Sequence, residues 1–385
     1  MKKQSLWMAA LIWFGAAISV AEIEAGGEIG ANWMALVLGH LLGGVLLFFS
    51  GFVGARLRQG AMATTASAFG SAGARFFALL NVVQLIGWIA VMNEQTTRAL
   101  AELSPRFASP LTHVVLSALV GIWVIVGILK TSRLATVAMG ALAVLMAVLS
   151  FRILAPVEPV PTTGETMPFW TAFEISAAMP LSWAPVIADY TRTTERPLAQ
   201  CALSVVVYTF ASLWMYAVGM MLVAQGPDMT LPTAIVRHGL SGIGIPILIV
   251  STVTTNLLAA HSTGESAQVV SPRLNVRAVV ACAVAAGAAL SIFGIAGHYI
   301  SFLYFIASVF APMAAVLVVN HFVVRRAAVR WNLLAWSVGF GAYQLASHFG
   351  TAPTAISLTL SAGFALVPRL RSQTPPANLH PCASQ

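Results

Sequence analysis

The sequence predicts an all-helical integral membrane protein with twelve transmembrane helices, and three observations lead to this fold class. Hydrophobic residues make up 58% of the 385-residue chain and charged residues only 8%, whereas about 25% of the residues in a soluble domain are charged. Apolar runs of about twenty residues, the length of a helix that crosses a bilayer, recur along the chain. Small residues and proline interrupt two of these runs at matching places. The composition therefore excludes a soluble globular protein and places the chain in the lipid bilayer.

The apolar runs place the expected helices one after another, with short loops between them. We expect them near residues 6–25, 33–53, 76–97, 111–129, 134–154, 168–188, 199–224, 243–263, 278–296, 299–322, 331–347 and 353–368. Because the loops leave no space for a soluble domain, residues 1–370 are expected to form a single transmembrane domain. The tail, residues 371–385, is polar and contains proline, so we expect it to be disordered.

The basic residues predict how the helices are oriented. With a cytoplasmic N-terminus, 16 of the 20 basic residues fall on the inner side. The outer segments hold only Arg98, Arg106, Arg152 and Arg237. Inner loops of membrane proteins carry the excess of Lys and Arg, so we expect both termini to be cytoplasmic and the protein to lie in the inner (plasma) membrane. This distribution also accounts for the net charge of +8 without a nucleic acid partner.

The interrupted runs are the first and the sixth. Residues 13–24 read WFGAAISVAEIE, and residues 174–185 read EISAAMPLSWAP. In the predicted orientation the two runs cross in opposite directions. Residues 6–154 and 168–322 would then form a five-plus-five inverted repeat, followed by two accessory helices over residues 331–368. Paired interrupted helices of this kind mark the mid-membrane binding site of secondary transporters. The sequence therefore favours a carrier.

Three acidic residues lie within the interrupted runs: Glu22, Glu24 and Glu174. A carboxylate is costly at hydrocarbon depth, so it usually faces a cavity or a polar partner. Glu24 lies at the outer end and is expected to be solvated. Glu22 lies deeper and is a candidate for binding substrate or a coupled proton. Glu174 fits a functional or a structural role equally well.

A tryptophan and an amide lie near mid-membrane in the third expected helix. Gln84 and Trp88 are one turn apart, on the same helical face. A flat indole beside an amide suits a flat, hydrogen-bonding heterocycle, because the indole stacks on the ring and the amide reads its edge. Ordinary helix packing is the alternative for Trp88. We expect both residues to bind substrate.

Side-chain oxygens are concentrated in the eighth expected helix, where residues 251–256 read STVTTN. An isolated hydroxyl in a membrane helix can bond back to the preceding turn, but five oxygen-bearing side chains in six positions suggest more. Hard cations prefer oxygen ligands, and the sodium sites of broken-helix carriers combine hydroxyls with unwound carbonyls. The run therefore predicts a cation site.

Other features are less informative. The membrane histidines His40 and His261 could carry protons, although a lone membrane histidine more often packs between helices. The three cysteines lack the spacing of a metal or redox site. The chain has no G-x-S-x-G, H-E-x-x-H or Walker motif, so we expect neither an enzyme nor a tightly bound cofactor.

Several segments resemble one transporter family. They are residues 13–23, Gly87-Trp88, the sequence SWAPVIADYTR at residues 182–192, Thr254-Thr255-Asn256 and His261-Ser262-Thr263-Gly264. They resemble the nucleobase:cation symporter-1 family of cytosine, purine, uracil, allantoin and thiamine-precursor permeases. Within it, the chain is most similar to the branch of hydroxymethylpyrimidine permeases. The resemblance implies a leucine-transporter-like fold with broken helices 1 and 6.

The resemblance also implies a sodium site. Its ligands would be the hydroxyls of Thr254 and Thr255 and the main-chain carbonyls of Ser251, Ala16 and Ser19. Sodium would be the coupling ion, with a proton as the alternative.

The same resemblance implies a substrate site. Trp88 would stack on the base, and Asn256 would border it. The chain departs from the family pattern at Pro180, which stands where the family offers a second aromatic ring; Trp183 could take its place. Met92 stands where the family pattern has an amide.

We therefore expect a monomeric carrier that imports a pyrimidine-type nucleobase or thiamine precursor by alternating access coupled to a cation. Hydroxymethylpyrimidine is favoured and cytosine is next, because Glu22 or Glu174 could bind the amidine edge of an aminopyrimidine through paired hydrogen bonds. The alternatives are an amino-acid carrier of the same architecture and a non-transporting membrane sensor or channel-like protein.

Overall fold

The computed structural model describes residues 5–126, 132–153, 167–226, 229–325 and 328–373, and within these ranges it contains helices and no strand. The α-helices are α1 Leu6–Ala17, α2 Val20–Ile29, α3 Trp33–Leu57, α4 Ala61–Thr64, α5 Ala66–Leu103, α6 Pro110–Val126, α7 Ser132–Ile153, α8 Phe169–Leu181, α9 Ala188–Thr191, α10 Pro197–Val223, α11 Leu231–Arg237, α12 Ser241–Val270, α13 Val276–Ile292, α14 Tyr299–Val319, α15 Val329–His348 and α16 Pro353–Gln373. Each of the twelve expected stretches coincides with a helix or a pair of helices. The tail from residue 374 onward lies outside the described residues.

Length and composition single out part of this set as membrane-spanning. Helices α3, α5, α10 and α12 and the segment Ile295–Val324, which contains α14, are long and apolar enough to cross a bilayer. Helices α1 and α2 together form a sixth such segment, bent by 55°. The structure thus supports an all-α membrane fold, while the count of twelve spans stays a prediction.

Both predicted interruptions are present. Helix α1 ends at Ala17, and Ile18 and Ser19 are extended before α2 begins. The Ser19 hydroxyl accepts a hydrogen bond from the Glu22 N–H at 3.2 Å, which caps the new helix. In the second interruption, α8 contains Pro180 one residue before its end and is followed by turns until α9. Proline lacks the N–H that would continue the helical ladder.

Glycines bring the interrupted spans close to their neighbours. A Cβ on Gly26 of α2 would lie 2.2 Å from the Tyr216 carbonyl oxygen of α10, and a Cβ on Gly43 of α3 would lie 2.4 Å from the Ala177 carbonyl oxygen of α8. Small residues permit such backbone contacts between membrane helices. Each broken span therefore packs on the second span of the other predicted half. An inverted repeat would give this reciprocal pairing, and the repeat itself stays a prediction.

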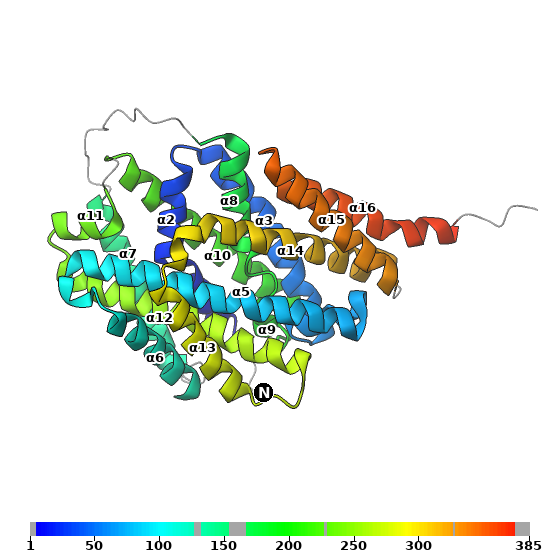
Figure 1. Cartoon of the computed structure of the whole chain (residues 1–385), viewed down its shortest axis with the longest axis horizontal. Coiled ribbons are helices and arrows are strands. Elements are labelled where there is room, and N and C mark those ends of the chain that lie inside the picture. Colours follow the sequence, from blue (N-terminus) through cyan, green and yellow to red (C-terminus); the bar gives the residue numbers. More distant parts are fainter. Residues whose placement is uncertain (1–4, 127–131, 154–166, 227–228, 326–327, 374–385) are drawn as a thin grey trace, which may run out of the picture.

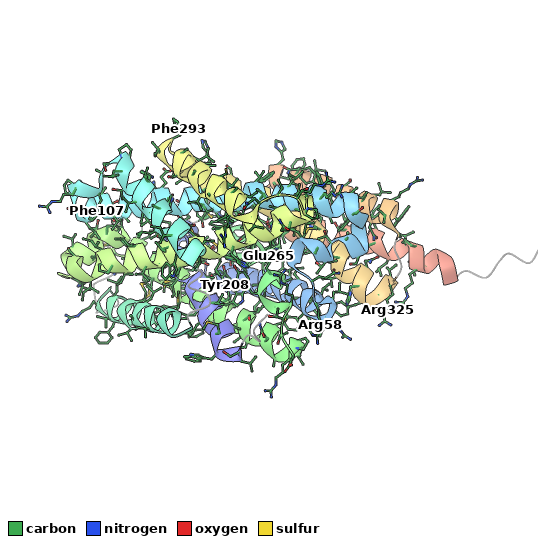
Figure 2. The ribbon with its side chains drawn as sticks, turned by 90° about the horizontal axis from the view of Figure 1, so that it is seen from below. Arg58, Phe107, Tyr208, Glu265, Phe293 and Arg325 are labelled. Atoms are coloured by element: carbon green, nitrogen blue, oxygen red, sulfur yellow. The ribbon has the colours of Figure 1, made fainter. Side chains whose placement is uncertain are left out.

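Residues that are expected on opposite sides of the membrane lie toward opposite ends of the helix bundle. Arg58 and Arg325, expected on the inner side, lie toward one end of the molecule in Figure 2, and Phe107 and Phe293, expected on the outer side, lie toward the opposite end. Helices α15 and α16 pack on each other, and α16 packs on α14, at the side of the bundle far from α6 and α7 (Figure 1).

Candidate functional site

Trp88 lies in the middle of α5 and is 3% exposed. Its ring is edge-on to two rings of the α14 region, with centroid distances of 5.5 Å to Phe302 and 6.0 Å to Tyr299. The Tyr299 hydroxyl donates a hydrogen bond to the Ala21 carbonyl oxygen at 3.1 Å. The tryptophan thus lies where α5 and α14 meet the first residues of α2, beside the first interruption.

Gln84 lies one turn before Trp88, and its orientation is fixed by its neighbours. Its Nε2 donates to Asn81 Oδ1 at 2.6 Å, and Asn81 Nδ2 donates to the Pro185 carbonyl oxygen at 3.1 Å. Because a carbonyl can only accept, Asn81 must present its nitrogen to Pro185 and its oxygen to Gln84. The Gln84 Oε1 is consequently the free end, and it is buried without a donor among the described residues.

Asn256 provides a second buried amide on the other side of Trp88 along the α5 axis. Its Nδ2 donates to Asn93 Oδ1 of α5 at 3.0 Å. Its Oδ1 is buried and finds no donor within the part of the chain that the structure describes. A buried acceptor without a donor is costly, so both amide oxygens are suited to a ligand that offers N–H groups. Gln84 and Asn93, the partner of Asn256, are about 13 Å apart along the α5 axis, with Trp88 between them.

The hydroxyl run of α12 meets the first interruption. Ser251 Oγ donates to the Ile18 carbonyl oxygen at 2.5 Å, and Thr255 Oγ1 lies 3.2 Å from the Gly15 carbonyl oxygen. The Ser251 carbonyl oxygen accepts from Thr255 Oγ1 at 3.0 Å and from Thr254 Oγ1 at 2.9 Å. Three carbonyl and three hydroxyl oxygens therefore gather at one place.

The expected hydroxyl residues and the expected Ser251 carbonyl are thus together. The carbonyls of the first span that the hydroxyls contact are those of Gly15 and Ile18, next to Ala16 and Ser19, where α1 ends and its last carbonyls lose their helical partners. The Ser19 side chain caps α2, and the Ala16 and Ser19 carbonyls stay predicted ligands. No group of three or more His, Cys, Asp or Glu side chains that could hold a metal occurs among the described residues.

Glu22 faces α10. Its Oε1 accepts a hydrogen bond from the Tyr208 hydroxyl at 2.8 Å, and its Oε2 lies 2.6 Å from Ser212 Oγ. Ser212 Oγ in turn lies 2.7 Å from His40 Nε2 of α3. The sequence analysis names Glu22 and His40 as separate candidates. Their connection could not be predicted, because it runs through Ser212, which is far from both in the chain.

The other two predicted substrate-binding residues, Glu174 and Trp183, lie in separate environments. Glu174 accepts hydrogen bonds from the Tyr343 hydroxyl at 2.7 Å, the Thr354 hydroxyl at 2.5 Å and the Thr354 N–H at 3.0 Å, which ties α8 to α15 and α16. Trp183 packs edge-on against Trp13 at 5.8 Å, in a different hydrophobic cluster from Trp88. The structure does not bring either residue to the Trp88 ring.

A cavity of about 630 Å³ opens on the predicted outer side. Its lining includes Glu24, Glu28, Arg98, Glu102 and Tyr299. Glu24 accepts a hydrogen bond from Gln95 Nε2 at 2.7 Å and lies 3.4 Å from Arg98, and its side chain, 39% exposed, still faces the cavity. Since Tyr299 also contacts Trp88, the cavity leads toward the candidate substrate site.

The predicted inner side is closed by contacts around the second interruption. Arg192 forms a bidentate ion pair with Glu265 of α12, with N–O distances of 2.6 and 2.8 Å. Asp189 Oδ1 accepts a hydrogen bond from the Ala61 N–H at 2.8 Å. These contacts fasten the end of the sixth span to α12 and α4.

The chain resembles solved transporter structures over nearly its whole length. The structure of Mhp1, a nucleobase-cation-symport-1 family transporter, in a closed conformation with bromovinylhydantoin bound superposes with a TM-score of 0.77 at 17% identity, covering 95% of this chain and 92% of Mhp1. Its inward-facing form gives a TM-score of 0.73 at 18% identity, covering 94% and 90%. A Na⁺-coupled sialic acid symporter in a substrate-bound outward-open state gives 0.67 at 14% identity, covering 94% and 89%.

The chain has the fold of these transporters. The expected all-α transporter architecture is therefore confirmed at the level of the fold. No protein-family model matches the sequence, and no curated protein is similar enough to it to count as a relative.

Proposed function

We propose that the protein is a cation-coupled secondary transporter of the nucleobase:cation symporter-1 family, which imports a pyrimidine-type heterocycle by alternating access. One observation carries the proposal: the α12 hydroxyl run meets the carbonyls of the first interruption, through the contacts from Ser251 to Ile18 and from Thr255 to Gly15. Oxygen ligands from two helices suit a sodium ion, and a bound ion would add its own links to the contacts between the two helices.

The substrate class follows from the groups around Trp88. The indole offers a stacking surface for a flat ring. The Gln84 and Asn256 amide oxygens are buried acceptors without donors, so they favour a ring with N–H groups on its edge. An aminopyrimidine has such an edge; hydroxymethylpyrimidine is the favoured substrate and cytosine the next. Mhp1 with bromovinylhydantoin bound is a fold relative that holds a small heterocycle.

The cavity on the outer side favours cationic ligands. Three acids line it, with a single arginine beside one of them. A cleft with an excess of one charge concentrates ions of the opposite sign. Sodium and a protonated aminopyrimidine would both be attracted, whereas a zwitterionic amino acid has no net charge and its carboxylate would have to avoid these acids. This argues against the amino-acid carrier of the same architecture.

A binding assay tests the proposal. The detergent-purified protein would be melted with hydroxymethylpyrimidine, cytosine, uracil or leucine, each with sodium or with choline. We expect the aminopyrimidines to raise the melting temperature, and sodium to increase that effect, because a ligand bound only to the folded state stabilises it. Stabilisation by leucine instead of the pyrimidines would refute the substrate assignment.

A further inference from the structure

Four buried polar side chains form a hydrogen-bonded chain that the proposed sodium and substrate sites do not use. Glu22 Oε2 lies 2.6 Å from Ser212 Oγ, which lies 2.7 Å from His40 Nε2; His40 Nδ1 lies 2.8 Å from Ser176 Oγ. All four residues are at most 1% exposed. They come from α2, α10, α3 and α8, so the chain joins both interrupted spans to the helices on which they pack.

The Nδ1 atom of the His40 imidazole must carry a proton. Ser176 Oγ donates to the Leu36 carbonyl oxygen at 2.6 Å, and His40 Nδ1 lies 3.2 Å from the same carbonyl. A carbonyl can only accept, and the single hydroxyl proton of Ser176 is already used. The Nδ1 atom therefore faces two acceptors, so it must be the donor.

The donors and acceptors around Ser212 require one more proton. If Nε2 is unprotonated, the Ser212 hydroxyl donates to it, and Glu22 must be a carboxylic acid that donates to Ser212. If Glu22 is a carboxylate, Ser212 donates to Glu22, and Nε2 must be protonated. In both arrangements the Glu22 carboxyl and the His40 imidazole share one proton through the serine hydroxyl. Without that proton, two lone pairs would face each other at hydrogen-bond distance.

The surroundings favour the uncharged arrangement, with a carboxylic acid and a neutral imidazole. The titratable groups that face the pair are tyrosines: Tyr208 donates to Glu22 Oε1, Tyr216 lies edge-on to the His40 ring at 4.8 Å, and Tyr299 bonds to the α2 backbone at Ala21. The other acid of this turn, Glu24, is bonded to Gln95 and Arg98. An ion pair in such a setting would lose solvation that its partners do not replace.

We propose that Glu22, Ser212 and His40 form a one-proton site, and that the protein releases and rebinds this proton as the interrupted spans move. On release, the Glu22 O–H bond breaks, the proton passes to water on the side that opens, and the resulting carboxylate accepts from Ser212 and Tyr208. The proton would then be a second coupled cation, separate from sodium. This coupling role rests on the proposed function, whereas the proton site itself does not.

Infrared spectroscopy of the purified protein tests the proton site without transport. We expect a carboxylic acid C=O band in the wild type, lost in Glu22→Gln and reversibly lost in alkaline buffer. The control Glu24→Gln, two residues along the same helix, should keep the band, because Glu24 is paired with Arg98. A wild-type spectrum without a band assignable to Glu22 would overturn the proposal, as would a band that persists in every buffer in which the protein stays folded.

Proteoliposomes test the coupling. Hydroxymethylpyrimidine uptake would be measured with and without an imposed pH gradient, acidic outside, at equal sodium on both sides. We expect the gradient to increase accumulation in the wild type and to lose that effect in Glu22→Gln and in His40→Asn, with folding checked by thermal melting. An equal response in wild type and both folded variants would overturn the coupling role. Absence of any pyrimidine uptake by the wild type would instead refute the proposed function, and the infrared result would still stand.

Discussion

The hydroxyl of Ser251 donates a hydrogen bond to the main-chain carbonyl of Ile18 across 2.5 Å, at the residue where the first span is interrupted. One helical turn earlier in that span, the Gly15 carbonyl oxygen accepts from Thr255. These contacts join α12 to the broken span through oxygens that a sodium ion could bind instead. A cation there would link the occupancy of one site to the relative position of two helices.

The cation site predicts the behaviour of Thr255→Ala. The substitution removes one hydroxyl ligand, so the sodium concentration for half-maximal uptake should rise roughly tenfold, the equivalent of about 1.4 kcal/mol. Sodium titration of hydroxymethylpyrimidine uptake measures this change. Thr263→Ala is the matched control on the same helix, because its hydroxyl bonds back to the Ala259 carbonyl oxygen of the preceding turn at 2.9 Å. Equal sodium dependence in both variants would remove Thr255 from the site.

If the substrate stacks on Trp88, its affinity should depend on the aromatic ring at this position. Trp88→Ala should weaken hydroxymethylpyrimidine binding by roughly 1–3 kcal/mol, about one to two decades of affinity, and Trp88→Phe should keep part of it. Calorimetric titration of the purified variants gives these affinities. Trp170→Ala, which removes a tryptophan that is 47% exposed on α8, should bind like the wild type. Unchanged affinity in a folded Trp88→Ala protein would exclude the stacking role.

Glu174 should affect stability more than binding. Its carboxylate accepts three hydrogen bonds from α15 and α16, so Glu174→Gln would set an NH₂ group against at least one of these donors. We expect a loss of roughly 1–3 kcal/mol, visible as a lower melting temperature, with substrate affinity retained. A variant that melts normally but no longer binds the pyrimidine would restore Glu174 to the substrate site.

Exchanging Arg192 and Glu265 with each other should preserve the ion pair between them. Arg192→Glu or Glu265→Arg alone would leave two like charges together and should lower the uptake rate and the melting temperature. The double exchange should recover much of both, with a coupling energy of about 0.5–3 kcal/mol. If the double variant is no better than the single ones, the ion pair is not what holds the inner side closed.

The sequence predicted the fold well because its main signals are local. Apolar runs and the interruptions near Ser19 and Pro180 depend on neighbouring residues, and both interruptions are where the sequence placed them. The contact between α12 and the first interruption was also anticipated. The carbonyls that the hydroxyls contact, Gly15 and Ile18, are each one residue from the predicted ligands Ala16 and Ser19, and which of them bind the ion stays a prediction.

The side-chain partners were harder to predict, because they depend on helices far apart in the chain. Glu174 bonds to Tyr343, which is 169 positions away, and Glu22 bonds to Ser212, which is 190 positions away. An acidic residue within a membrane segment indicates that it has a polar partner, but the sequence does not identify that partner. The role of His40 was the hardest to predict, because its contacts with Ser176 and Ser212 form only in the folded structure.

Accumulation of labelled hydroxymethylpyrimidine in proteoliposomes tests the central claim most directly. With an inward sodium gradient and the same pH on both sides, the internal concentration should rise above the external one. It should fall back to equality when a sodium ionophore dissipates the gradient. If the wild-type protein equilibrates the pyrimidine but never concentrates it under the sodium gradient, the account of a sodium-coupled carrier is contradicted.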